Sequence, residues 1–251
     1  MLNQSFRDSI VKVRPLLVTV LNLNHDSLTQ LKSCERSTIK FIKPAIRREV
    51  CAGADIVDIG FERGRLKLRF FRNITLTGLK LLVRYNWLIF SLDYRRYEEV
   101  TRVANVYSVI NYIAGIRDKR VLNFSSLICC FSRLVLNGSF CVLEALEYFR
   151  LVYKMFARAG RISCILDVGL GFLNSAQANF DALSLASSFR GMSALCLSRK
   201  RFLNLFLNGA DDDLKSALVV AKFGAQAAFI RVHNVGLTGL ILSASLYWDT
   251  F

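Results

Sequence analysis

The sequence predicts a (β/α)8 TIM barrel of the α/β class, in a single domain. Short apolar runs recur along the whole chain, stretches with helical periodicity separate them, and a polar residue stands at or just past the end of nearly every run. Buried parallel strands read as continuous apolar runs, and barrels keep their chemistry where the strands end. The chain has 251 residues, and one barrel takes about 250. We therefore expect one domain over residues 1–251, without a linker.

Eight apolar runs are the expected strands, in chain order 16–22, 55–60, 87–92, 107–111, 132–136, 162–167, 194–198 and 227–232. Helical periodicity between the runs groups apolar residues on one face: Tyr97, Val100, Val103 and Ala104 in one helix, and Leu143, Leu146, Phe149, Val152 and Phe156 in the longest. In the fifth unit the helix is expected almost directly after Leu136. Strands that alternate with helices are typical of parallel sheets with right-handed crossovers.

A doubly wound open sheet is the structural alternative. Such a sheet gathers its chemistry at one switch point, where the strand order reverses. Here polar residues end nearly every strand, which favours closure of the sheet into a barrel. These residues are Asn22, Asp58, Arg65, Asp93, Asn111, Asp167, Lys200 and His233.

Composition narrows the partners. The formal charge is +15, from 34 Lys and Arg against 19 Asp and Glu, which favours anionic partners such as a phosphorylated substrate. The basic residues are spread out and are not interleaved with aromatic ones, so nucleic-acid binding is not favoured. Although 53% of the residues are hydrophobic, no run reaches the ~18 uncharged apolar residues of a membrane span. We expect no membrane association.

The seven cysteines do not predict a disulfide framework. Their number is odd, they are scattered, and no CxxC pair is present. Cys164 and Cys196 fall inside apolar runs, where thiols behave as small hydrophobic groups. The first residues hold no long apolar core of the kind found in a secretory signal. We expect a reducing compartment: the cytoplasm, with an organelle matrix as the alternative.

The polar strand ends combine carboxylates, amides, cations and an imidazole. The cations could hold a phosphate or diphosphate, since Arg binds such groups in bidentate fashion. The carboxylates could bind the N–H groups of a polar heterocycle or stabilise a developing carbocation. An Asn or Asp together with phosphate oxygens could hold Mg²⁺. Taken singly, each residue has a simpler interpretation as a helix cap or a solvated charge, but their shared position at consecutive strand ends favours a site.

The strand ends also carry a family pattern. The segments are LLVTVLNLNHDSL at 16–28, GADIVDIGFERGR at 53–65, SLD at 91–93, IN at 110–111, ILDVGLGF at 165–172, SRK at 198–200 and RVH at 231–233. In order and spacing they resemble dihydropteroate synthase, the pterin-binding barrel of folate biosynthesis. The resemblance covers nearly the whole chain. The related pterin-binding methyltransferases share the barrel and the early motifs but are not expected to carry the SRK and RVH pair.

The resemblance implies a transferase that joins 6-hydroxymethyl-7,8-dihydropterin diphosphate to 4-aminobenzoate and releases diphosphate, with Mg²⁺ as cofactor. It implies a pterin pocket formed by Asp93, Asn111, Ile113, Asp167, Phe172 and Lys200. Asp93, Asp167 and Lys200 of this set would be catalytic. It implies that diphosphate is held by Asn22, Arg65, Arg231 and His233, with Asn22 also placing the metal.

Two loops depart from the family pattern. Asn24-His25 replace a threonine and a proline, and Arg63-Gly64 replace a serine and a threonine. These loops carry the aminobenzoate site in the family, and Cys196 stands where a glycine usually approaches the pterin. The alternative function is therefore a catalytically inactive barrel that serves as a basic scaffold or an RNA-associated subunit. The apolar stretch 237–246 is expected to be the last barrel helix, with the pairing of two copies in a homodimer as the alternative.

Overall fold

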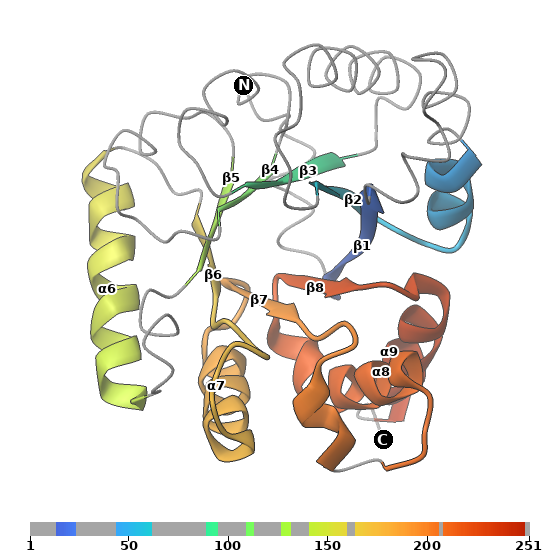
Figure 1. Ribbon diagram of the computed structural model, residues 1–251. Helices are drawn as coiled ribbons and strands as arrows, with labels where there is room; N and C mark the ends of the chain where they lie inside the picture. Colours follow the sequence, from blue (N-terminus) through green and yellow to red (C-terminus); the bar gives the residue numbers. More distant parts are fainter. Residues whose placement is uncertain are drawn as a thin grey trace.

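The computed structural model describes residues 14–23, 44–61, 89–94, 109–112, 127–131, 141–159, 164–205 and 208–248. Its strands pair in parallel and in chain order, and the first also pairs with the last, so the sheet closes on itself (Figure 1). The strand bounds are β1 (Leu16–Leu23), β2 (Ile56–Phe61), β3 (Ile89–Tyr94), β4 (Val109–Tyr112), β5 (Leu127–Phe131), β6 (Cys164–Asp167), β7 (Ser193–Cys196) and β8 (Phe229–Val232).

Helices cover the outside of the closed sheet. The bounds of the helical segments are 44–51, α6 (Val142–Arg158), α7 (Ala176–Ser188), η3 (Arg201–Leu205), α8 (Asp212–Phe223), η4 (Gly224–Gln226) and α9 (Val235–Trp248). Helix α6 packs on β6, α7 on β7, α8 on β8, and α9 on α8 and β1. The α/β class and the parallel sheet are confirmed. The full eightfold alternation stays a prediction, because most residues between β2 and β5 lie outside the described ranges.

Side-chain capping fixes where two of these helices begin. The Ser175 hydroxyl accepts from the Ala178 N–H at the start of α7. The Asp211 carboxylate accepts from two backbone N–H groups at the start of α8, and its negative charge also complements the positive end of the helix dipole. Both helices therefore start directly after the loops that follow β6 and β7.

The apolar strands serve two hydrophobic cores. Successive side chains of a strand point to opposite faces of the sheet. In β1, Leu16 and Val18 belong to the cluster inside the barrel, whereas Leu17 belongs to the cluster between strands and helices. In β8, Phe229 lies inside and Ile230 outside. In β1, β6, β7 and β8 the described side chains of both faces are largely buried, which is why the sequence shows continuous apolar runs there rather than alternation.

Seven of the eight expected strands lie within two residues of the described ones, but the fifth was misplaced. The expected strand 132–136 is wrong, since β5 is Leu127–Phe131 and pairs with β4 and β6 over that range. The segment LICCF carries no charge and suits a strand that is buried on both faces, whereas 132–136 includes Arg133. Helix α6 begins at Val142, later than a start almost directly after Leu136.

The buried face of α6 also differs in part from the expectation. Phe149, Val152 and Phe156 are buried as predicted, but Leu143 is 75% exposed and Leu146 is 39% exposed. The buried residue in the first turn is Ala145. The helix carries apolar residues on more than one face, so periodicity alone did not select the face that meets the barrel. The helix expected around 97–104 lies outside the described residues.

Helix α9 is the last barrel helix, as expected for 237–246. Val235, Thr238 and Leu242 are buried, and a Cβ built on Gly239 would lie 3.1 Å from Leu17 Cδ1, so small size at this position allows the helix to approach β1. No charged residue occurs in the helix, and its exposed residues include Leu240, Tyr247 and Trp248. Over the described part of the chain, no helix combines the length and the apolar character needed to cross a membrane.

The α6 face can be tested by two truncations of similar chemistry. Phe149 is 1% exposed and packs edge-on against Phe189 at a ring distance of 5.6 Å. Phe149→Ala leaves a cavity, so we expect a loss of about 3–5 kcal/mol in the free energy of unfolding. Leu143→Ala should change it by less than about 0.5 kcal/mol, because the side chain is mostly solvated. Equal losses in a urea titration would contradict the observed burial.

Candidate active site

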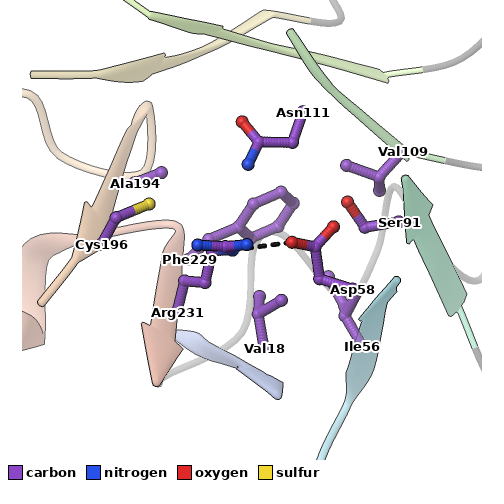
Figure 2. Close-up of a pocket in the computed structure, with 10 residues that line it drawn as sticks. All are labelled: Val18, Ile56, Asp58, Ser91, Val109, Asn111, Ala194, Cys196, Phe229 and Arg231. Carbon is purple, nitrogen blue, oxygen red and sulfur yellow. Dashed lines mark hydrogen bonds and ion pairs between the residues drawn. The ribbon is translucent and has the colours of Figure 1, made fainter. Parts of the chain in front are cut away.

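In five of the strands, the interior of the barrel changes from apolar to polar over two residues. Inside-facing Ile56 is followed by Asp58, Val109 by Asn111, Ile165 by Asp167, Ala194 by Cys196, and Phe229 by Arg231. Side chains two residues apart share a face, so a polar layer lies directly on an apolar one at the carboxyl ends of the strands. A pocket occupies this boundary (Figure 2).

The pocket combines an apolar floor with a polar rim. The space between its lining residues is about 310 Å³, open solvent at the mouth included. Figure 2 shows the Asn111 amide, the Cys196 thiol, and the Asp58 and Arg231 side chains directed toward its centre. The lining residues are Val18, Ile56, Asp58, Ser91, Val109, Asn111, Ala194, Cys196, Phe229 and Arg231.

An ion pair crosses the rim of the pocket. Arg231 Nε donates to Asp58 Oδ2 at 2.7 Å, with the Asp58 side chain 1% exposed and that of Arg231 20% exposed. The two residues belong to β2 and β8, which flank β1 on either side. The pair therefore bridges the two strands that neighbour β1, inside the barrel.

Asp167 is a buried carboxyl next to a thiol. Its Oδ1 accepts from the Gly169 N–H at 2.8 Å, and the Cys196 thiol lies within hydrogen-bonding reach of the carboxylate. Burial raises the pKa of Asp167, opposed by these hydrogen bonds and by the charges of Lys200 and Arg231. Burial, together with the negative charge of Asp167, raises the pKa of Cys196 well above its usual range. At neutral pH the thiol is therefore a protonated donor rather than a nucleophile.

A buried amide shapes the loop that follows β6. Asn179 is 1% exposed. Its Oδ1 accepts from the Gly171 N–H at 2.7 Å, and its Nδ2 donates to the carbonyls of Ser175 at 2.7 Å and Leu173 at 3.4 Å. One side chain of α7 thus satisfies three backbone groups of the loop, which holds the loop against the helix.

This loop carries an aromatic ring to the side chain of Lys200. Lys200 Nζ lies 4.7 Å from the centroid of the Phe172 ring, a cation–π distance. Gly171 has φ +81°, and a Cβ built on it would lie 2.5 Å from Lys200 Cδ. The position therefore needs glycine for two reasons, its backbone conformation and the close passage of the lysine stem.

The turn after β7 is centred on Arg199, and the side chains of the residues on either side of it contact different partners. Arg199 has φ 50°, the one positive value for a non-glycine residue among those described. The Arg199 guanidinium pairs with Asp213 at 3.1 Å, and the backbone N–H of Arg199 donates to Ser216 Oγ at 3.3 Å. These two contacts hold the strained residue in place. Ser198 on one side reaches His233, and Lys200 on the other reaches Phe172.

His233 is paired and uncharged. Ser198 Oγ and His233 Nδ1 form a short hydrogen bond. Burial lowers the pKa of His233, and the nearby charges of Arg199 and Arg231 lower it further. Since the ordinary pKa is 6.5, the imidazole is neutral at pH 7. With Ser198 donating to Nδ1, the ring proton lies on Nε2 and can be donated to an anion.

The structure gathers most of the residues that the sequence singled out. Asn111 and Arg231 line the pocket, the charges of Lys200 and Arg231 act on Asp167, and Arg231 also acts on His233. Phe172 is half exposed beside Lys200.

Four other predicted positions are described only in part or not at all. Asp93 pairs in register with Asn111, and Asn22 pairs with Gly60 near the end of β1, but their side chains are not described. Arg65 and Ile113 lie outside the described residues. Among the residues that are described, no group of three or more His, Cys, Asp or Glu side chains could hold a metal ion.

Three polar partners were not predicted from the sequence. Asp58 was noted only as a strand-end carboxylate, and its pairing with Arg231 depends on barrel closure. Cys196 was interpreted as a small hydrophobic residue, but it lines the pocket beside Asp167. Ser198 was seen only within its motif, without its contact to His233. Cys164, by contrast, is buried in the outer core as expected.

Known proteins match this chain in structure but not in sequence. No protein-family model and no curated protein sequence matches the chain. The solved structure of a Xanthomonas albilineans dihydropteroate synthase in complex with indole-2-carboxylic acid and 6-chloroguanine superposes with a TM-score of 0.75 at 20% identity, over 95% of this chain and 93% of that one. The Anaplasma phagocytophilum synthase with bound 6-hydroxymethylpterin-monophosphate gives a TM-score of 0.74 at 18% identity, over 94% and 100%.

A second Xanthomonas albilineans structure, with 4-aminobenzoic acid, gives a TM-score of 0.72 at 21% identity, over 94% of this chain and 92% of that one. These three neighbours agree in fold over nearly the full length of both chains. The chain therefore has a fold like that of the dihydropteroate synthases.

Two glycine substitutions separate backbone strain from the contact with Lys200. Gly171 and Gly191 both have positive φ, but a Cβ on Gly191 would meet nothing within 4 Å. Each change to Ala should lower the free energy of unfolding by about 1 kcal/mol or more through backbone strain. Gly171→Ala should in addition displace Lys200 from Phe172, which a crystal structure of the variant would show. An unmoved Lys200 would contradict the proposed role of this glycine.

The buried Asp167 should cost stability when it is ionised. Its pKa in the folded protein is raised, so the folded state takes up a proton more readily than the unfolded state as the pH falls. We expect Asp167→Asn to be more stable than the parent at pH 7. The difference should shrink as the pH falls through the raised pKa toward 3.8, the ordinary value. Chemical denaturation across this pH range measures it, and a less stable Asn variant at pH 7 would refute the expectation.

Proposed function

We propose that the protein is a dihydropteroate synthase, which joins 6-hydroxymethyl-7,8-dihydropterin diphosphate to 4-aminobenzoate and releases diphosphate. The observation that carries the proposal is the polar layer at the carboxyl ends of the strands. It brings the Asp58 carboxylate, the Asn111 amide and the Arg231 guanidinium to one pocket, and the charges of Lys200 and Arg231 act on the buried Asp167, on a fold like that of the dihydropteroate synthases. A heterocycle with a diphosphate arm needs this mixture of donors and acceptors.

The amide and the carboxylates would bind the pterin. Asn111 presents both a donor and an acceptor to the pocket, and Asp167 can accept from ring N–H groups. Asp93, in register with Asn111 on the neighbouring strand, would add a second carboxylate, and Ile113 an apolar wall. Lys200 would donate to a ring acceptor, and the exposed ring of Phe172 would cover one face of the heterocycle.

The cations and the imidazole would bind the diphosphate. Arg231 supplies a guanidinium at the rim, and His233 supplies a neutral N–H. A guanidinium binds phosphate oxygens in bidentate fashion. Arg65 and Asn22 complete this set in our proposal. The diphosphate would then lie on the β1–β2–β8 side of the mouth, and the pterin on the β3–β4–β6–β7 side.

Charge stabilisation would drive the reaction. When the C–O bond to diphosphate breaks, the electron pair leaves with diphosphate and positive charge develops on the pterin methylene. Asp167 and Asp93 would stabilise that charge in a site where water is largely excluded. The aminobenzoate nitrogen would then form the new C–N bond and lose its proton. No covalent intermediate with the protein is needed.

Mg²⁺ is proposed as the cofactor. Magnesium is usually held by one or two protein ligands together with substrate phosphates, so the absence of a larger ligand cluster among the described residues is compatible with such a site. Asn22, near the carboxyl end of β1, would be its protein ligand. The ion would neutralise charge on the departing diphosphate.

We further propose that residues 1–251 form one (β/α)8 domain that works in the cytoplasm, or alternatively in an organelle matrix. The uncharged exposed face of α9, with Leu240, Tyr247 and Trp248, would be the contact in a homodimer. Membrane lipids and nucleic acids are not among the proposed partners.

A direct assay tests the proposed activity. The purified protein is mixed with Mg²⁺, the dihydropterin diphosphate and 4-aminobenzoate, and dihydropteroate is followed by mass spectrometry. Lys200→Ala should lower turnover at least about 100-fold, since it removes a cation beside the buried Asp167. Lys222→Ala, on the exposed surface of α8, is the matched control and should retain full activity.

Each outcome of the assay has a separate meaning. A folded Lys200→Ala variant with parental turnover would refute the assigned pocket. If the parent forms no product but binds pterin, the aminobenzoate half of the site has been lost. If it binds no pterin and binds RNA with strong salt dependence, the inactive scaffold is the better interpretation.

A further inference from the structure

The Asp58 carboxylate has one paired oxygen and one unpaired oxygen. Oδ2 accepts from Arg231 Nε, whereas Oδ1 is fully buried and no donor among the described residues reaches it. A buried carboxylate is costly unless its charge is compensated and its oxygens accept hydrogen bonds. Stability therefore does not explain why a carboxylate is buried at this position. The alternative is that Asp58 acts on its partner, Arg231.

The ion pair fixes the orientation of the Arg231 guanidinium. The Nε–H lies in the plane of the guanidinium. A hydrogen bond to Nε therefore fixes both the plane of the guanidinium and the directions in which its other N–H groups point. Asp58 is held by the ladders of β2 to β1 and β3, and Arg231 by the ladders of β8 to β1 and β7. Both ends of the bond thus rest on the closed sheet rather than on a loop.

We propose that Asp58 is a positioning residue, which orients Arg231 for the diphosphate of the substrate. This inference rests on the proposed function and adds to it a carboxylate that takes no part in binding the substrate itself. Asp58 also compensates the charge of Arg231 in the unloaded site. If Asp58 were only a nearby negative charge, removing it would tighten anion binding. Loss of orientation has the opposite effect, so the two roles predict opposite signs.

Two matched variants test this role. Asp58→Asn keeps the shape and an acceptor but removes the charge. Asp55→Asn removes the carboxylate that directly precedes β2 and pairs with Arg14 at 2.8 Å, away from the pocket. Binding of inorganic diphosphate and of 6-hydroxymethylpterin is measured by calorimetry, and folding by circular dichroism.

We expect Asp58→Asn to weaken diphosphate binding about tenfold and to change pterin binding less than about threefold. Asp55→Asn should change neither. Unchanged or tighter diphosphate binding by folded Asp58→Asn would overturn the positioning role while leaving the proposed function intact. A parent protein that binds neither diphosphate nor pterin would overturn both.

A measurement on the parent protein covers the case in which Asp58→Asn fails to fold. In ¹⁵N NMR spectra the Nε–H of Arg231, assigned by comparison with Arg231→Lys, should exchange slowly with water and should shift when inorganic diphosphate is added. An Arg231 Nε–H that exchanges as fast as that of the exposed Arg47, or that does not respond to bound diphosphate, would overturn the proposal.

Discussion

Closure of the parallel sheet is the constraint on which the rest of the structure depends. Once β1 pairs with both β2 and β8, every second residue of each strand must face an interior that water cannot fill. The interior positions near the amino ends of the strands are therefore apolar. Polar side chains occur toward the carboxyl ends, where the pocket opens and burying them costs less. The same geometry brings residues as distant in sequence as Asp58 and Arg231, 173 positions apart, into direct contact.

The polar layer is stable because its members compensate each other. Arg231 is paired with Asp58 and also lowers the pKa of both Asp167 and His233. Burial acts in the opposite direction on Asp167, so this carboxyl is destabilised without a bound cation. A site of this kind favours ligands that bring positive charge near Asp167 and negative charge near Arg231. These electrostatics are compatible with the proposed substrate, a pterin that carries a diphosphate.

Much of the fold could be predicted because strands buried on both faces leave continuous apolar runs. The fifth strand could not, since LICCF and the next apolar run are adjacent and hydrophobicity alone does not rank them. The α6 face was partly misassigned because none of the three leucines of the helix belongs to its buried set, which is Ala145, Phe149, Val152 and Phe156. At the site, residue types and strand ends indicated Asn111, Asp167, Lys200 and Arg231. The contact of Asp58 with Arg231 depends on closure of the sheet, whereas Cys196 and Ser198 contact residues that follow or belong to a neighbouring strand. Residue types alone do not indicate any of these three pairings.

The sheet and the loops that follow β6 and β7 hold the members of the polar layer in place. Asp58 and Arg231 are held by strand ladders, Asp167 by Gly169 and Cys196, His233 by Ser198, and the 168–175 loop by Asn179. Because the strands are fixed by barrel closure, the groups proposed to hold the pterin and the diphosphate are positioned largely by the sheet itself.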